Sequence, residues 1–131
     1  MKIKKLNLSG PCIIEPKVFY DDRGFFFESW NKDEYLKKKL NIKVVQENFA
    51  HSKKNVLRGL HIQYPKLQGK LISVMNGRVF DVVVDVRKNS PTFGKWCSAI
   101  LDSKKKKSLW VPEGFGHGYL VLSKFADVMY K

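Results

Sequence analysis

Short runs of β-branched and aromatic residues, separated by turn-forming residues, constrain the fold of this chain more than any other feature. These runs span residues 44–50, 56–64, 71–75, 79–87, 96–101 and 108–111. The segments between them are rich in Asn, Asp, Ser, Gly and Pro, which favour turns. Many short strands at this spacing are typical of a β-sandwich or barrel, with a jelly roll as the natural closed form.

One of these runs, residues 79–87, shows a regular alternation of side chains. Its even-numbered positions are apolar, namely Phe80, Val82, Val84 and Val86. Its odd-numbered positions include Asp81 and Asp85. Because successive side chains of a strand point to opposite faces, the alternation predicts that the even-numbered face packs against the core. The face with the two aspartates is then expected to meet water or a ligand.

Local signals predict one hairpin and one helix. The Asn76-Gly77 pair stands between two apolar runs, which favours a hairpin closed by a type I′ turn with positive φ at both residues. The helix is expected near residues 31–40, since Asn31 can cap it and acidic residues follow in its first turn. The lysines at 37–39 suit its other end. We therefore expect an all-β fold with one short helix.

Length and composition indicate one soluble domain with an anionic partner. The chain has 131 residues, which predicts a single domain over residues 1–131. Its 25 Lys and Arg against 12 Asp and Glu give a net charge of +13, which favours nucleic acid, a membrane surface or a phosphorylated small molecule. No apolar run approaches the roughly 20 residues that cross a bilayer, and no leader peptide is recognisable. We expect a cytoplasmic protein with Cys12 and Cys97 as buried thiols.

The densest polar cluster lies between Gln46 and Lys70. It comprises Gln46, Asn48, His51, Ser52, Arg58, His61, Gln63, Gln68 and Lys70. His61 is either a half-buried strand histidine satisfied by one hydrogen bond or a general base that titrates near neutrality. Lys70 is either a surface charge or a group that stabilises an oxyanion, and Arg58 can hold a carboxylate or a phosphate. On a regular strand Arg58 and His61 point to opposite faces, so a bulge at Gly59 is needed to bring both to one pocket.

Three other segments contain chemically notable residues. In residues 110–119, three glycines and a proline surround His117, which predicts a tight loop between strands. Residues 21–28 predict a turn that leads into an aromatic edge strand. The four lysines at 104–107 are expected at a solvated turn, because nucleic-acid binding requires basic residues spread along a face together with stacking aromatics. The three histidines lack the close spacing typical of a metal site, so no metal is predicted.

A set of motifs follows one another in order along most of the chain. They are residues 22–28 (DRGFFFE), 46–48 (QEN), 56–63 (VLRGLHIQ), 68–71 (QGKL), 80–85 (FDVVVD) with 90–94 (SPTFG), and 110–118 (WVPEGFGHG) with 130–131 (YK). In this order they resemble the signature of the dTDP-4-dehydrorhamnose 3,5-epimerase family. Each motif alone is modest evidence, whereas their succession is highly specific.

The resemblance implies a fold, a reaction and a set of roles. It implies a cupin-type jelly-roll β-sandwich that acts as a homodimer without metal or other cofactor. The substrate of the family is a dTDP-linked 4-keto-6-deoxyglucose, whose ketone acidifies the protons at C3 and C5. By this resemblance His61 is the base that removes these protons, Tyr130 the acid that returns one to the opposite face, and Lys70 the group that stabilises the enolate. The implied substrate-binding residues are Arg23, Glu28, Gln46, Asn48, Arg58 and His117, some of which reach the site from the partner subunit.

The chain departs from the family pattern at two points. Ala50 stands where relatives often place a serine. Relatives also continue beyond the motif matched by Tyr130 and Lys131, with an aspartate that pairs with the catalytic histidine and an aromatic group that stacks on the thymine. Two alternatives therefore stay open: a related sugar-nucleotide 3-epimerase or ketoisomerase, and a non-catalytic nucleotide-sugar-binding module. Nucleic-acid binding ranks last, because a nucleoside diphosphate sugar already accounts for a basic pocket.

Overall fold

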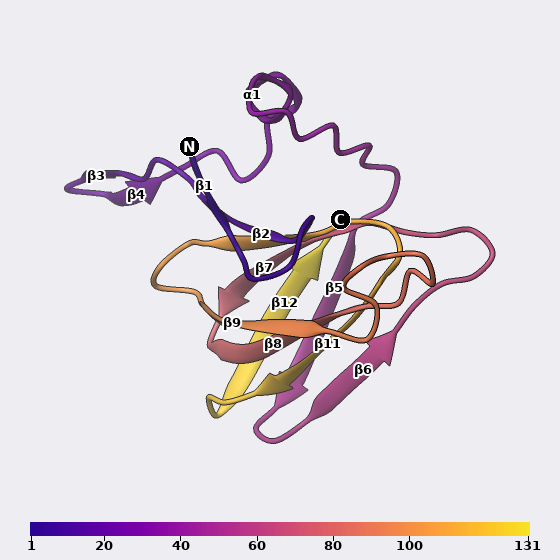
Figure 1. The fold of residues 1–131 in the computed structure, drawn as a ribbon. Helices are drawn as coiled ribbons and strands as arrows, with labels where there is room; N and C mark the ends of the chain where they lie inside the picture. Colours follow the sequence, from indigo (N-terminus) through magenta and orange to yellow (C-terminus); the bar gives the residue numbers. More distant parts are fainter.

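The computed structural model describes residues 1–131 and consists of two facing β-sheets with one short helix (Figure 1). The elements are β1 (Lys2–Lys5), β2 (Cys12–Glu15), β3 (Phe19–Asp21), β4 (Gly24–Phe26), α1 (Lys32–Lys37), β5 (Asn48–Lys53), β6 (Leu57–His61), β7 (Lys70–Asn76), β8 (Arg78–Asp85), β9 (Trp96–Asp102), β10 (Ser108–Val111), β11 (Phe115–Val121) and β12 (Phe125–Tyr130). The larger sheet has the order β1-β2-β10-β7-β12-β5 and the smaller β6-β11-β8-β9, while β3 and β4 form a separate hairpin. This arrangement confirms the predicted all-β jelly-roll sandwich.

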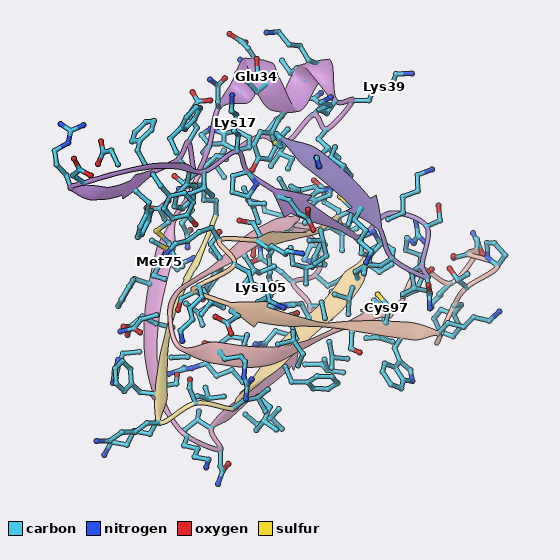
Figure 2. All side chains as sticks on the ribbon, turned by 90° about the vertical axis from the view of Figure 1, so that its left-hand side faces the viewer. Lys17, Glu34, Lys39, Met75, Cys97 and Lys105 are labelled. Atoms are coloured by element: carbon cyan, nitrogen blue, oxygen red, sulfur yellow. The ribbon has the colours of Figure 1, made fainter.

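The main core fills the space between the two sheets. It contains 15 buried residues, among them Ile72 of β7 and Val83 of β8. A second, smaller cluster lies on the outer face of the larger sheet, where Leu71 packs with Tyr35 of α1. Successive residues of β7 therefore serve opposite sides of the same sheet. Figure 2 shows the helix at one end of the molecule, with the side chain of Glu34 on it.

Strand β8 faces the core with its odd-numbered side chains, so the predicted orientation is wrong. Asp81 and Asp85 are both 0% exposed, whereas the even-numbered Phe80 lies half-buried on the outer face of the smaller sheet. A buried carboxylate is tolerated only with polar partners. Asp81 has such a partner in His117, and Asp85 has one in Arg87. The alternation marked the two faces of the strand correctly but could not reveal these partners.

The predicted hairpin at Asn76-Gly77 is also wrong. Strand β7 belongs to the larger sheet and β8 to the smaller, and the two do not pair. Of the two turn residues only Gly77 has a positive φ, at 80°. A Cβ at Gly77 would collide with the carbonyl oxygen of Phe125. Glycine is needed here because the chain crosses from one sheet to the other against the start of β12.

Several local predictions are confirmed. The Asn31 side chain caps α1 by accepting hydrogen bonds from the N–H groups of Asp33 at 3.1 Å and Glu34 at 3.2 Å. The helix ends earlier than predicted, before Lys39 with its φ of 62°. Both cysteines are free and buried, and burial raises the pKa of Cys12 to about 11. No helix of the structure is long and apolar enough to cross a membrane.

The lysine turn at residues 104–107 is only partly solvated. Lys104 and Lys105 are exposed, as predicted. The Lys107 ammonium donates a hydrogen bond to Glu15 at 2.5 Å. The ammonium of Lys106 lies 3.9 Å from the centre of the Phe25 ring on the β3–β4 hairpin. Lys106 and Lys107 thus connect the turn after β9 to the β3–β4 hairpin and to β2, respectively.

Candidate active site

Polar side chains of the larger sheet gather at one end of the space between the sheets. Tyr130 of β12 pairs with Asn48 of β5 on one side and with Ile72 of β7 on the other. Directly paired residues share a face, and Ile72 belongs to the main core. Lys70 lies two positions before Ile72 on the same strand and therefore faces the same way. The predicted site residues Asn48, Lys70 and Tyr130 thus lie on adjacent strands, and their side chains share the inner face of the larger sheet.

A cavity of about 260 Å³ opens at this end of the sheet. Its lining includes Gln46, Asn48, Lys70 and Tyr130. The Gln46 amide nitrogen donates a hydrogen bond to the Asn48 side-chain oxygen at 3.0 Å, which orients both amides. Four residues from three separate motifs are therefore brought together in one cavity.

On the smaller sheet a bulge turns Arg58 and His61 toward the same face. His61 pairs with His117 and Arg58 pairs with Tyr119, so three steps along β6 match two steps along β11. Gly59 permits this geometry, because its φ is 103°. A Cβ at Gly59 would lie 2.6 Å from the carbonyl oxygen of His117. The bulge that the sequence required at this glycine is confirmed.

His117 lies inside strand β11, so its predicted place in a tight loop is wrong. Strand β11 pairs with β6 on one side and β8 on the other. The neighbouring glycines serve close strand packing instead of a turn, since a Cβ at Gly118 would lie 2.6 Å from the Arg58 carbonyl oxygen. Within this sheet the Nε2 atom of His117 lies 2.8 Å from one Asp81 oxygen and 3.0 Å from the other. His117 is 6% exposed, so the pair is largely shielded from solvent.

Asp81 connects the two sides of the site electrostatically. Burial raises the pKa of Asp81, and the His117 ring and the Lys70 ammonium oppose this rise. Burial lowers the pKa of Lys70, and the charge of Asp81 opposes that change in turn. Sequence reasoning assigned Asp81 no role in the site, because its partner His117 is 36 positions away and leaves no local signal.

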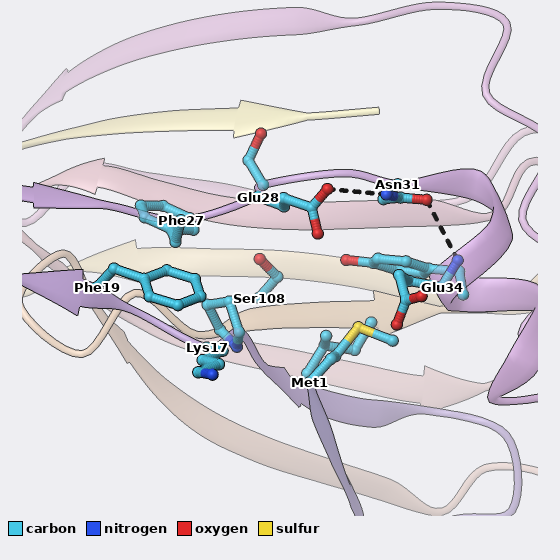
Figure 3. A pocket seen from close by; sticks show the side chains of 12 residues that line it. Met1, Lys17, Phe19, Phe27, Glu28, Asn31, Glu34 and Ser108 are labelled. Atoms are coloured by element: carbon cyan, nitrogen blue, oxygen red, sulfur yellow. Dashed lines mark hydrogen bonds between the residues drawn. The ribbon is translucent and has the colours of Figure 1, made fainter.

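Arg23 and Glu28 lie apart from this cavity, on and after the hairpin that projects from the sheets (Figure 1). The Arg23 side chain is 90% exposed and pairs with Asp21 at 2.6 Å. Glu28 lines a separate cavity of about 180 Å³ between the hairpin and α1. There its carboxylate accepts a hydrogen bond from Asn31 at 2.8 Å (Figure 3). A single chain therefore does not bring these two residues to the cavity at Lys70.

Three predicted site residues have side chains whose chemistry suits proton transfer, although only Lys70 and Tyr130 line the cavity and His61 does not. His61 is an exposed imidazole that can act as a general base. Lys70 is a cation that can neutralise a developing oxyanion, and Tyr130 is a phenol that can donate a proton. No group of three or more His, Cys, Asp or Glu side chains is placed to hold a metal ion.

Comparison with known proteins identifies the family. The model of the family described as dTDP-4-dehydrorhamnose 3,5-epimerase matches residues 5–131. The chain is 50% identical to dTDP-4-dehydrorhamnose 3,5-epimerase from Salmonella typhimurium over 135 residues, covering 100% of this chain and 73% of that protein. Its identity to the Escherichia coli protein of the same name is 46% over 133 residues, covering 100% of this chain and 72% of the relative.

Solved structures agree with this assignment. The dTDP-6-deoxy-D-glucose-3,5-epimerase of Legionella pneumophila, in complex with dTDP-4-keto-L-rhamnose, superposes with a TM-score of 0.95 at 49% identity and covers 99% of this chain and 70% of that one. The Bacillus anthracis dTDP-4-dehydrorhamnose 3,5-epimerase, with TDP and PPi bound, gives a TM-score of 0.96 at 43% identity, covering 99% of this chain and 75% of that one. The chain belongs to the dTDP-4-dehydrorhamnose 3,5-epimerase family.

Proposed function

We propose that this chain epimerises C3 and C5 of dTDP-4-dehydro-6-deoxy-D-glucose to give dTDP-4-dehydro-L-rhamnose. The observation that carries the proposal is the cavity at which Lys70 and Tyr130 meet on the inner face of one sheet. His61 supports it, because the bulge in β6 turns this imidazole to the inner side of the facing sheet. Membership of an epimerase family supplies the reaction.

In the proposed mechanism His61 removes a proton from the carbon next to the C4 ketone. The electron pair of the broken C–H bond moves to the C4 oxygen, and Lys70 stabilises the resulting enolate. Tyr130 then donates its phenolic proton to the same carbon from the opposite face, which inverts that centre. Exchange with solvent returns His61 and Tyr130 to their starting protonation states. The sugar is neither oxidised nor reduced.

The nucleotide part of the substrate is proposed to bind through the remaining polar residues of the site. Arg58 is assigned to the diphosphate, because a guanidinium can hold two phosphoryl oxygens at once. Gln46, Asn48 and His117 are assigned to the sugar and its linkage. The net charge of +13 supports an anionic substrate, since it raises the local concentration of anions around the molecule.

Incubation with dTDP-4-keto-6-deoxyglucose in deuterated water tests the reaction. We expect deuterium at both C3 and C5, detected by NMR, and a loss of at least about 100-fold in exchange rate for His61→Asn. Deuterium at C3 alone favours the alternative of a 3-epimerase. Binding of dTDP without any exchange contradicts the enzymatic proposal and favours a nucleotide-sugar-binding module.

We also propose a homodimer in which each hairpin carries Arg23 and Glu28 to the site of the other copy. The hairpin exposes four large rings, with exposed fractions of 49% for Phe19, 73% for Tyr20, 52% for Phe25 and 65% for Phe26. Contiguous exposed apolar surface of this kind marks an interaction site. A second copy is the fitting occupant, because the same hairpin holds substrate-binding residues that its own chain leaves far from the cavity.

Sedimentation equilibrium tests the dimer. The expected mass is twice the chain mass of 15.2 kDa. Phe26→Glu should shift the mass to that of one chain and weaken dTDP binding, since it places a charge in the interface. Phe93→Glu is the matched control, because Phe93 is 56% exposed but lies outside the hairpin. A wild-type protein with the mass of one chain contradicts the proposal.

A further inference from the structure

The guanidinium of Arg58 is held on one side by strand β5. Its Nε atom donates a hydrogen bond to the Ser52 hydroxyl at 2.8 Å. Its Nη2 atom donates to the carbonyl oxygen of His51 at 3.3 Å. Because Nε and Nη2 form one of the two donor forks of arginine, β5 occupies that fork. The fork formed by Nη1 and the second Nη2 hydrogen points away from these partners.

Ser52 is a fixed anchor for this contact. It is 4% exposed and pairs in register with Ala126 in the larger sheet. Arg58 belongs to the smaller sheet, so the hydrogen bond between them joins the edges of both sheets. A mobile arginine must give up rotamer freedom when it binds an anion, which weakens binding. An arginine already held by Ser52 has given up that freedom before the ligand arrives.

We infer that Ser52 is a positioning residue that orients Arg58 toward the diphosphate of the bound nucleotide sugar. The inference rests on the proposed function, because it takes Arg58 as the diphosphate contact. Ser52 acts on the ligand through Arg58, since its hydroxyl is buried and accepts the Nε hydrogen bond. The free Nη1–Nη2 fork then receives two phosphoryl oxygens in a bidentate contact.

A double-mutant cycle with dTDP as the ligand tests this role. Isothermal titration calorimetry gives the Kd of the wild type, Ser52→Ala, Arg58→Ala and the double variant. We expect Arg58→Ala to weaken dTDP binding about 10- to 100-fold and Ser52→Ala about 3- to 10-fold. The double variant should bind no more weakly than Arg58→Ala, because Ser52 has nothing to position once the guanidinium is gone.

Two further variants separate positioning from a merely structural effect. Ser73→Ala is the matched control, because it removes a part-buried hydroxyl that bonds to Ser108 on the outer face of the larger sheet, away from Arg58. It should leave the Kd for dTDP unchanged. Ser52→Thr keeps a hydroxyl on the strand and should restore binding to within about twofold of the wild type. Should Ser52→Ala fail to fold, Ser52→Cys takes its place with the same expectation.

The outcomes distinguish this inference from the proposed function. If Arg58→Ala weakens dTDP binding while Ser52→Ala does not, the role of Ser52 is wrong and that of Arg58 stands. If Arg58→Ala leaves the Kd unchanged, the assignment of Arg58 to the diphosphate fails, and the inference fails with it. If the effects of Ser52→Ala and Arg58→Ala add in the double variant, Ser52 acts by another route and the inference is overturned.

Discussion

Two buried aspartates on strand β8 show how the immediate partners of a residue set its charge. Asp85 accepts hydrogen bonds from Arg87 and from two nearby hydroxyls, and these donors, Arg87 first, hold its pKa well below the usual range. Asp81 has one hydrogen-bonding partner, His117, so burial dominates and its pKa rises. Both side chains are 0% exposed. The direction of each pKa shift therefore follows its largest cause, which is burial for Asp81 and the hydrogen bonds from Arg87 for Asp85.

The lowered pKa of Asp85 predicts a specific loss of stability in acid. The folded state binds the proton more weakly than the unfolded state, so the stabilisation is complete above the ordinary pKa of 3.8 and is lost as the pH falls through the folded value. We expect the Tm of the wild type to drop steeply below about pH 4. Asp85→Asn should have a lower Tm at neutral pH and a flatter profile in acid.

Calorimetric melts of both proteins, from neutral pH down to about pH 2, measure this difference. Asp22→Asn serves as the control, because Asp22 is exposed and lies in the hairpin turn. An equally steep acid profile for Asp85→Asn and the wild type would show that other carboxylates control acid unfolding.

For Tyr119 we predict the opposite effect on stability, namely a variant that is more stable than the wild type. Its hydroxyl is buried without a hydrogen-bond partner, although Ser52 lies near enough to oppose the rise in the pKa of Tyr119 that burial causes. An unsatisfied buried polar group costs about 1 to 3 kcal/mol. Tyr119→Phe should therefore raise the free energy of unfolding by about 1 kcal/mol, measured by urea denaturation with an unchanged m-value. A less stable variant would mean that the hydroxyl has a partner in solution.

At the scale of elements, the contact between β6 and β11 depends on two facing glycines. A Cβ at Gly118 would lie 3.2 Å from the Cα of Gly59. The two backbones can approach this closely only because neither residue has a side chain. The bulge in β6, and with it the position of His61, is thus built by the backbone of two motifs that are distant in the sequence.

Replacing Gly59 should disturb both stability and binding. Gly59→Ala combines a φ of 103° with a Cβ 2.6 Å from the His117 carbonyl oxygen. We expect a loss of about 1 to 3 kcal/mol in urea denaturation and weaker dTDP binding, because Arg58 moves with the bulge. Gly94→Ala is the matched control, since Gly94 also has a positive φ but a Cβ there would meet no atom within 4 Å. Equal losses in both variants would show that the close approach of β6 and β11 is unimportant.

At the scale of the whole molecule, most positive charges have no ionic partner. The chain carries 25 Lys and Arg, of which five pair with a carboxylate. The remaining charges repel one another, and a net charge of +13 opposes the compact state through this repulsion. The aromatic hairpin is held to the sheets partly by one of these lysines, Lys106, through its contact with Phe25.

This repulsion predicts that potassium chloride stabilises the protein. The distance over which charges interact falls from about 30 Å at 0.01 M salt to about 8 Å at 0.15 M, so the Tm should rise between these concentrations. A variant with Lys104→Glu and Lys105→Glu lowers the net charge by four, from +13 to +9. Its Tm should depend less on salt, because both lysines are exposed at the turn. A Tm that falls with added salt would mean that ion pairs outweigh the repulsion.

The prediction from sequence succeeded where the determining interactions are local. Residues 108–111 form strand β10 as expected, and Asn31 caps the helix, because both depend on neighbouring side chains. It failed for residues 115–121, where glycines suggested a turn but serve close packing within β11. Strand β12 was missed altogether, although it carries Tyr130.

The sequence by itself determined that the chain is an all-β sandwich, which residues are candidates for the chemistry, and which family it belongs to, because strand propensity and motif order are properties of the chain alone. Only the tertiary structure decided which face of β8 is buried, that β7 and β8 lie in different sheets, and that Asp81 holds His117 while Ser52 holds Arg58. These outcomes depend on contacts between strands that are far apart in the sequence. An alternating pattern shows that a strand has two different faces, but it does not show which residues pack against each face.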